Sequence, residues 1–153
     1  MSRRAALALV GAFVCASPAA AQEWRTITQS RQAAGEDLLR VDVEYGAGRF
    51  VVSPGATSLL YYAKLRYDAE VFRPTTSYTD GRLKLGFEGG NLKGRNFKAG
   101  QLDLQLGTSI PLDLQLKFGA VEADVELGGL RIREANIATG ASKTSLRVSQ
   151  PNP

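Results

Sequence analysis

Apolar and polar residues alternate with a period of two along most of the chain, and this pattern limits the possible folds more than any other feature. It runs through residues 39–45, 83–87, 102–106, 112–118 and 123–127. Successive side chains of a β-strand point to opposite faces, so the pattern predicts half-buried strands. Beyond residue 21 no stretch keeps helical spacing for three turns, and the Asp80-Gly81 pair predicts a two-residue hairpin. We therefore predict an all-β domain.

A Gly-Ala pair between two apolar runs occurs three times, at Gly46-Ala47, Gly119-Ala120 and Gly140-Ala141. Gly119 and Gly140 are 21 residues apart. A strand, a tight corner and a second strand at this spacing are what one coil of a β-solenoid requires. Glycine allows the tight turn, and we expect each alanine to lie inside its corner. The favoured fold is a solenoid of stacked sheets, and the alternative is a β-sandwich.

The first 21 residues read as a cleaved signal peptide. Arg3 and Arg4 precede an apolar run, and small residues precede the expected cleavage site between Ala21 and Gln22. Val14 lies before Cys15, which argues against a lipoprotein. Cleavage leaves residues 22–153 as one domain without cysteine, with 17 basic and 15 acidic residues. We expect an exported protein, periplasmic or extracellular and not integral to the membrane, and this charge balance gives no reason to expect nucleic-acid binding.

The residue types exclude several kinds of catalysis. The sequence has no histidine, and its single cysteine leaves with the signal peptide, so Ser-His-Asp, Cys-His and ordinary zinc sites are excluded. The pattern indicates no metal or cofactor site. Carboxylates remain on two of the alternating strands, and we interpret them as the solvated polar faces of these strands. The alternative is a carboxylate-dependent polysaccharide lyase or hydrolase. These carboxylates are Asp42, Glu44, Glu122, Asp124 and Glu126.

Positive charge gathers between residues 82 and 98, where five basic residues face only Glu88. The glycines of this segment predict a flexible loop, which could contact anionic lipid or acidic glycan. The candidate contact residues are Arg82, Lys84, Lys93, Arg95 and Lys98. A second candidate is an aromatic cluster that could bind sugars or proteins, although we expect about two thirds of it to be core. It comprises Tyr61, Tyr62, Tyr67, Phe72 and Tyr78.

Three stretches resemble the bacterial toast-rack proteins, a group that includes LiaF-like envelope-response proteins and adhesin-like exported proteins. They are residues 39–54 (LRVDVEYGAGRFVVSP), 111–129 (PLDLQLKFGAVEADVELGG) and 130–153 (LRIREANIATGASKTSLRVSQPNP). The resemblance implies a right-handed stacked β architecture and a role in the cell envelope, either adhesin-like or linked to envelope stress. It assigns no functional site.

The residues at the end of the chain, 149–153, look like a turn between coils. A solenoid that stopped there would leave its last coil uncovered, so we expect either a truncated chain or an end that docks on a partner or a second copy. Together these observations predict an exported, non-enzymatic binding or scaffold module of the cell envelope, whose partner is a protein or another envelope component.

Overall fold

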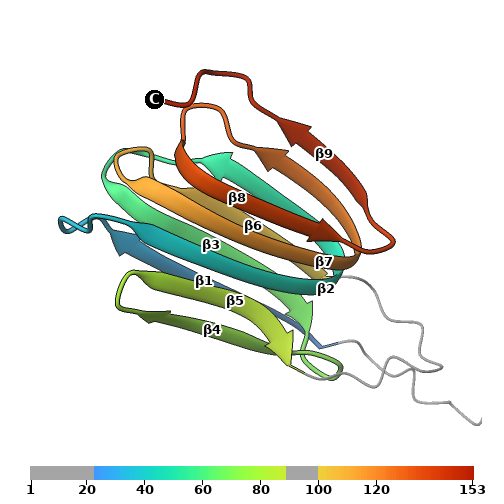
Figure 1. The fold of residues 1–153 in the computed structure, drawn as a ribbon. Coiled ribbons are helices and arrows are strands. Elements are labelled where there is room, and N and C mark those ends of the chain that lie inside the picture. Colours follow the sequence, from blue (N-terminus) through green and yellow to red (C-terminus); the bar gives the residue numbers. More distant parts are fainter. Residues whose placement is uncertain (1–22, 89–99) are drawn as a thin grey trace, which may run out of the picture.

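The computed structural model describes residues 23–88 and 100–153, and within them it contains nine β-strands and no helix (Figure 1). In chain order the strands are β1 (Trp24–Gln32), β2 (Leu39–Pro54), β3 (Leu59–Asp68), β4 (Arg73–Thr79), β5 (Arg82–Glu88), β6 (Gly100–Leu106), β7 (Pro111–Glu126), β8 (Arg131–Thr139) and β9 (Lys143–Arg147). The predicted all-β class is confirmed. The expected signal peptide lies outside the described residues.

The hairpin between β4 and β5 turns through Asp80 and Gly81, as predicted. Both residues have positive φ, 49° and 71°, a conformation that two-residue hairpin loops require and that aspartate and glycine tolerate. The pairing of Thr79 with Arg82 closes the turn directly.

The two longest strands, β2 and β7, form the centre of the molecule. They pair in parallel from Leu39 opposite Leu112 to Val52 opposite Val125, with a gap in the register at Gly46 and Gly119. Figure 1 shows both strands turning back at this point, so that each runs along the front of the molecule and returns behind it. Each strand therefore has two halves with different neighbours.

These halves organise two stacks of strands that face each other. The first stack has the order β4-β5-β2-β7-β8, and the second has the order β1-β3-β6-β2-β7-β9. The chain passes from β7 through a short turn into β8, then past Gly140 into β9, and both strands lie parallel to β7. This parallel stacking of successive coils confirms the solenoid-like prediction over the β-sandwich, whose sheets are antiparallel.

The core lies between the two stacks and is filled by the alternating apolar side chains. Aromatic rings occupy its centre, where the Phe50 and Phe118 centroids are 4.9 Å apart and those of Tyr45 and Phe87 are 5.3 Å apart. Each fully buried large side chain contributes about 1.5–3 kcal/mol to folding. The largest of these side chains are Tyr45, Phe50, Leu39, Leu60, Leu83, Leu102, Leu104, Leu106, Leu112, Leu116, Leu130 and Val41.

The three corner glycines lie in one column. A Cβ atom on Gly119 would collide with the carbonyl oxygen of Gly46, and the Gly140 N–H donates a 2.8 Å hydrogen bond to the Phe118 carbonyl. The alanines beside them differ: Ala47 is buried, whereas Ala120 and Ala141 are exposed. The expectation that each alanine lies inside its corner is therefore wrong for the second and third, because their side chains face solvent.

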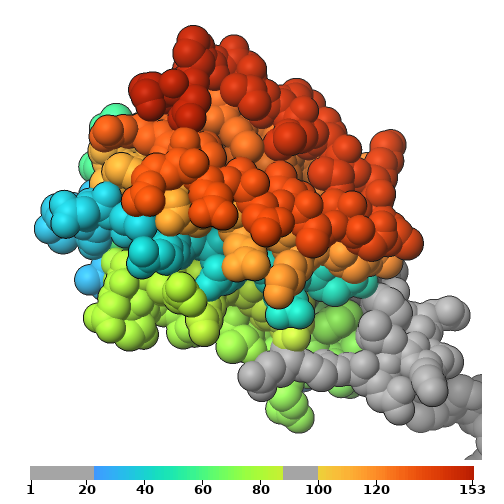
Figure 2. All heavy atoms as spheres, viewed as in Figure 1, coloured from blue at the N-terminus to red at the C-terminus, as the bar shows by residue number. Residues whose placement is uncertain are grey.

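The two ends of the stacks also differ. At one end β1 and β4 meet, and Gln29 Nε2 donates a 2.7 Å hydrogen bond to Thr76 Oγ1 between the stacks. At the other end β8 and β9 pair only with β7 among the described strands, and Leu146 and Val148 are 54% and 61% exposed. Figure 2 shows the orange and red C-terminal segments forming this end of the surface.

The described residues include no helix with the length and hydropathy needed to cross a membrane.

Candidate functional site

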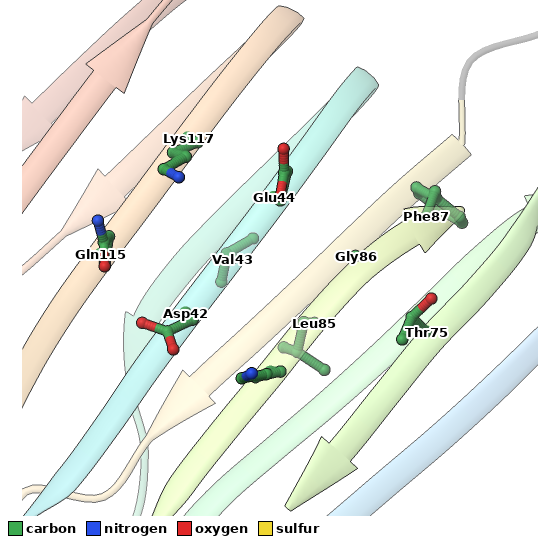
Figure 3. A pocket seen from close by; sticks show the side chains of 10 residues that line it. Asp42, Val43, Glu44, Thr75, Leu85, Gly86, Phe87, Gln115 and Lys117 are labelled. Atoms are coloured by element: carbon green, nitrogen blue, oxygen red, sulfur yellow. The ribbon is translucent and has the colours of Figure 1, made fainter. Parts of the chain in front are cut away.

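A groove of about 360 Å³ crosses the outer face of the first stack (Figure 3). The polar residues that line it come from β2, β4, β5 and β7: Asp42, Glu44, Thr75, Lys84, Gln115 and Lys117. In Figure 3 Val43, Leu85 and Phe87 lie behind the polar side chains. The groove therefore has polar walls above an apolar layer that belongs to the core.

The groove exists because one position on its floor has no side chain. Gly86 of β5 lies between Glu44 of β2 and Thr75 of β4 in the register, and it follows the inward-facing Leu85. A Cβ atom on Gly86 would lie 3.2 Å from the Glu44 carbonyl oxygen and 3.8 Å from its Cβ. Any side chain here would fill the space beside Glu44, so glycine keeps the groove open.

Charges of both signs alternate across the groove. Lys84 lies opposite Asp42, and Lys117 lies opposite Glu44. Opposite charges on neighbouring strands attract each other. The groove thus presents hydrogen-bond donors and acceptors side by side, which suits a ligand that is rich in hydroxyl or mixed charged groups.

A chain of ion pairs adjoins the groove. Arg82 Nη1 lies 3.6 Å from Asp42 Oδ2, while Asp113 lies between Arg40, at 3.9 Å, and Arg133, at 3.7 Å. Such exposed pairs contribute only about 0–1 kcal/mol each, so they mainly orient side chains. A second hollow of about 200 Å³ lies among them and shares Asp42 with the groove, which extends the polar surface toward β8.

The carboxylates of β7 serve structural contacts. Asp124 accepts a 3.3 Å hydrogen bond from Arg49, and Glu122 lies opposite Lys143. Glu126 Oε1 accepts hydrogen bonds from the backbone N–H groups of Ser149, at 3.0 Å, and Gly128, at 2.7 Å. These two bonds lower the pKa of Glu126, the opposite of the shift that a general acid needs.

Two of the basic candidate residues occupy a strand instead of a loop. Arg82 and Lys84 lie on the outer face of β5, where they alternate with the buried Leu83 and Leu85. The expected loop is therefore wrong for these two residues, because the apolar alternation holds them in the sheet. Lys93, Arg95 and Lys98 lie outside the described residues.

Most of the aromatic cluster is core, as expected. Tyr61, Tyr67 and Phe72 are buried, whereas Tyr62 and Tyr78 are partly exposed. The Tyr61 and Tyr78 centroids are 5.8 Å apart, and the Tyr78 ring is covered by the Arg31 guanidinium at 4.5 Å. The cluster therefore stabilises the contact between the stacks and does not form an open aromatic platform.

Sequence reasoning identified Asp42 and Glu44 as a polar strand face but missed Gly86, Gln115 and Lys117. A signal for Gly86 was present, because a glycine inside an alternating strand marks a place where another group approaches closely. Gln115 and Lys117 gain their position only from the pairing of β7 with β2. Among residues 23–88 and 100–153, no cluster of three or more acidic, histidine or cysteine side chains is placed to hold a metal ion.

A solved structure from Clostridium sporogenes, described as a "putative cell adhesion protein", is similar to the chain with 21% identity and a TM-score of 0.70. The match covers 84% of this chain and 63% of that one, so the chain spans less than two thirds of this neighbour's length. A "putative adhesin" from Parabacteroides distasonis matches at 10% identity over 80% of this chain and 56% of its own, with a TM-score of 0.40. The search of curated proteins gives no match.

One family covers nearly the whole chain. The match to Toast_rack_N, described as the N-terminal domain of toast_rack (DUF2154), extends over residues 19–152 and so includes every described strand. The matched range also contains the three corner glycines, Gly46, Gly119 and Gly140. The chain belongs to the Toast_rack_N family.

Proposed function

We propose that the chain is an exported, non-enzymatic binding module of the bacterial cell envelope with an adhesin-like role, and that it holds a polar envelope glycan in the groove around Gly86. The observation that carries this proposal is the groove itself, in which a missing side chain opens a space between carboxylates and ammonium groups. The description of the Clostridium sporogenes protein as a cell adhesion protein points in the same direction.

The chemistry of the groove favours a sugar over a strongly charged ligand. Its volume of about 360 Å³ suits one or two sugar units, since small-ligand sites occupy about 300–1,000 Å³. Asp42 and Glu44 accept hydrogen bonds, Lys84 and Lys117 donate them, and Gln115 does both. A polyanion would be repelled by the carboxylates of Asp42 and Glu44, and a polycation by the ammonium groups of the two lysines.

The proposal is tested by titrating fragments of bacterial envelope polysaccharides into the protein and measuring heat or fluorescence. Gly86→Gln places a side chain in the groove and should weaken binding at least tenfold. Glu122→Gln, on the other half of β7, is the matched control and should bind as the wild type does. Equal binding by the Gly86→Gln variant, shown to be folded by its circular dichroism, would remove the groove from the proposal.

A glycan-cleaving enzyme is the second candidate function, and the placement of Asp42 and Glu44 in the groove is the observation that favours it. Turnover of anionic polysaccharides that Asp42→Asn or Glu44→Gln abolishes would replace the binding proposal. Alanine variants of Glu122, Asp124 and Glu126 serve as the comparison, and we expect them to leave any such turnover unchanged.

Contact with anionic lipid or glycan through the segment around Lys93, Arg95 and Lys98 is a separate part of the proposal, carried by the local excess of positive charge. It predicts salt-sensitive binding to liposomes that contain phosphatidylglycerol. Reversal of these three charges should weaken the binding, and unchanged binding would reject the contact. A link to envelope stress follows only from the LiaF-like resemblance; a sensor kinase gene beside this one would support it.

A further inference from the structure

One row of polar side chains crosses the outer face of the first stack. Its members lie opposite one another in the register of β4, β5, β2, β7 and β8, one from each strand. Neighbouring strands are about 4.7–4.9 Å apart, so the row extends over roughly 19 Å. We call these residues the polar row: Ser77, Lys84, Asp42, Gln115 and Asn136.

The polar row follows a depression that is longer than the groove around Gly86. A hollow of about 320 Å³ beside the β4–β5 hairpin shares Lys84 with the groove. The hollow of about 200 Å³ toward β8 shares Asp42 and Gln115 with the groove, and Figure 3 shows these two side chains on neighbouring strands. Every residue of the polar row lines at least one of the three spaces, which therefore adjoin one another along the row.

Most of the polar row is available to a ligand. Asp42 has an ion pair, with Arg82 at 3.6 Å, but the other four side chains make no hydrogen bond or ion pair within the described part of the chain. Lys84 can only donate hydrogen bonds and Asp42 can only accept them, while the remaining three side chains do both. The hydroxyl groups of a sugar also donate and accept, so a sugar unit can bond to each member of the row.

The outer face of the second stack is polar too, but several of its side chains bond to one another. Gln101 donates a 3.0 Å hydrogen bond to Asp103, and Arg49 donates one of 3.3 Å to Asp124. The polar row differs from such a solvated face in two ways. Its groups are mostly unpaired, and they lie along adjoining hollows.

The spacing of the polar row favours a ligand with a regular repeat. Across the strands a new hydrogen-bonding group follows about every 4.8 Å, which is close to the length that one sugar unit adds to a straight β-1,4-linked glycan. Along a strand the next outward side chain is two residues away, at about 6.5 Å. A straight glycan therefore keeps in step with the side chains when it runs across the strands.

The polar row faces away from the direction in which coils are added. Coils join the stack beside β8, along the hydrogen-bonding direction, whereas the row points outward from the sheet. A further coil would therefore lengthen the row and would not cover it.

We propose that the outer face of the first stack binds a straight β-1,4-linked glycan along the polar row, across the strands and with one sugar unit on each strand. The inference rests on the proposed function, because the groove around Gly86 forms the centre of the path. It adds the length and direction of the ligand and two binding positions outside the groove. Ser77 on β4 contacts one end of a chain of five units, and Asn136 on β8 contacts the other.

The probes are oligomers of β-1,4-linked N-acetylglucosamine with two to six units, which are straight and uncharged. Isothermal titration calorimetry with the whole protein should show an affinity that rises at least tenfold from two units to five and then levels off. Ser77→Ile and Asn136→Ile should each weaken binding of the five-unit oligomer at least threefold and leave binding of the two-unit oligomer unchanged. Thr28→Ile, at an exposed hydroxyl residue on the edge strand β1, is the matched control and should bind as the wild type does.

Equal affinity for the two-unit and five-unit oligomers would overturn the inference and leave the groove proposal standing. Unchanged binding of the five-unit oligomer by the folded Ser77→Ile and Asn136→Ile variants would do the same. Binding of envelope polysaccharide fragments without binding of any oligomer would also overturn it, because the row predicts a straight β-1,4-linked chain. If neither kind of ligand binds, the proposed function fails and this inference fails with it. Melting curves show whether each variant is folded, and each end variant tests its own end of the row if the other does not fold.

Discussion

Replacing Gly119 with alanine tests the stacked corners directly, because the cost is steric and the same column supplies its own controls. A Cβ atom on Gly119 would collide with the Gly46 carbonyl oxygen and would lie 3.3 Å from the Gly46 Cα. The register holds Phe118 opposite Tyr45 and Ala120 opposite Ala47, so the backbones cannot separate without breaking these pairs.

The three corner glycines should rank in a defined order. A Cβ atom on Gly46 would have no neighbour within 4 Å, and one on Gly140 would have its nearest neighbours at 3.3 Å. Gly46→Ala should therefore raise the free energy of unfolding by about 0.5 kcal/mol, because alanine lowers the entropy of the unfolded chain. The free energy of unfolding of Gly140→Ala should stay within about 1 kcal/mol of the wild-type value. That of Gly119→Ala should fall by about 1–3 kcal/mol, which is the usual cost of an overpacked site.

The measurement is urea unfolding followed by Trp24 fluorescence and circular dichroism, with thermal melts alongside. The expected difference between Gly46→Ala and Gly119→Ala is about 1.5–3.5 kcal/mol, which corresponds to roughly 5–12 °C in Tm for a domain of this size. The reasoning is refuted if the two variants melt within about 2 °C of each other with the same dependence on urea.

The remaining predictions concern single contacts. The backbone N–H groups of Ser149 and Gly128 lower the pKa of Glu126 in the folded protein. The ionised carboxylate therefore stabilises the fold at pH values above the pKa of this group in the unfolded chain. This stabilisation is lost as the pH falls through the lower pKa of the folded protein. Glu126→Gln should therefore reduce Tm at pH 7 and have little effect at pH 3; an equal reduction at both values would contradict this. The buried Tyr45 hydroxyl has no hydrogen-bond partner among the described residues, so Tyr45→Phe should leave the free energy of unfolding unchanged or raise it by up to about 1 kcal/mol; a clear loss in urea unfolding would show a partner. Burial also raises the pKa of Tyr45, so absorbance titration at 295 nm should show this phenol ionising only when the protein unfolds. Gln29→Ala breaks the 2.7 Å bond to Thr76 between the stacks and should cost about 1 kcal/mol, whereas Gln101→Ala, on the exposed face of β6, serves as its control and should cost less.

The sequence allowed the local structure of this chain to be predicted well, because alternation and turn chemistry act over a few residues. The coil from Gly119 to Gly140 was predictable for the same reason, since its two corners lie one turn apart in the chain. The pairing of β2 with β7 was not, because Leu39 and Leu112 are separated by four other strands. Nothing local tells an alternating strand which distant strand it will join.

The candidate sites show the same limit. The glycines of residues 82–98 predicted a loop that included Arg82 and Lys84, although the alternation through Leu83 and Leu85 predicted a strand at the same place. Apolar burial decided the outcome, because exposed charges are compatible with either structure. The groove around Gly86 could not be predicted from the sequence because its walls come from β2, β4, β5 and β7, whose order follows only from the complete fold.

The central position of β2 has a consequence for how the chain folds. Its neighbours β5, β6 and β7 all come later in the chain, and Leu112 follows its partner Leu39 by 73 residues, whereas Ile132 follows its partner Leu112 by 20. Closing the longer loop costs about 1 kcal/mol more in chain entropy. The coil of β7, β8 and β9 can therefore form as a local unit, while the centre of β2 stays unpaired until β7 has been made.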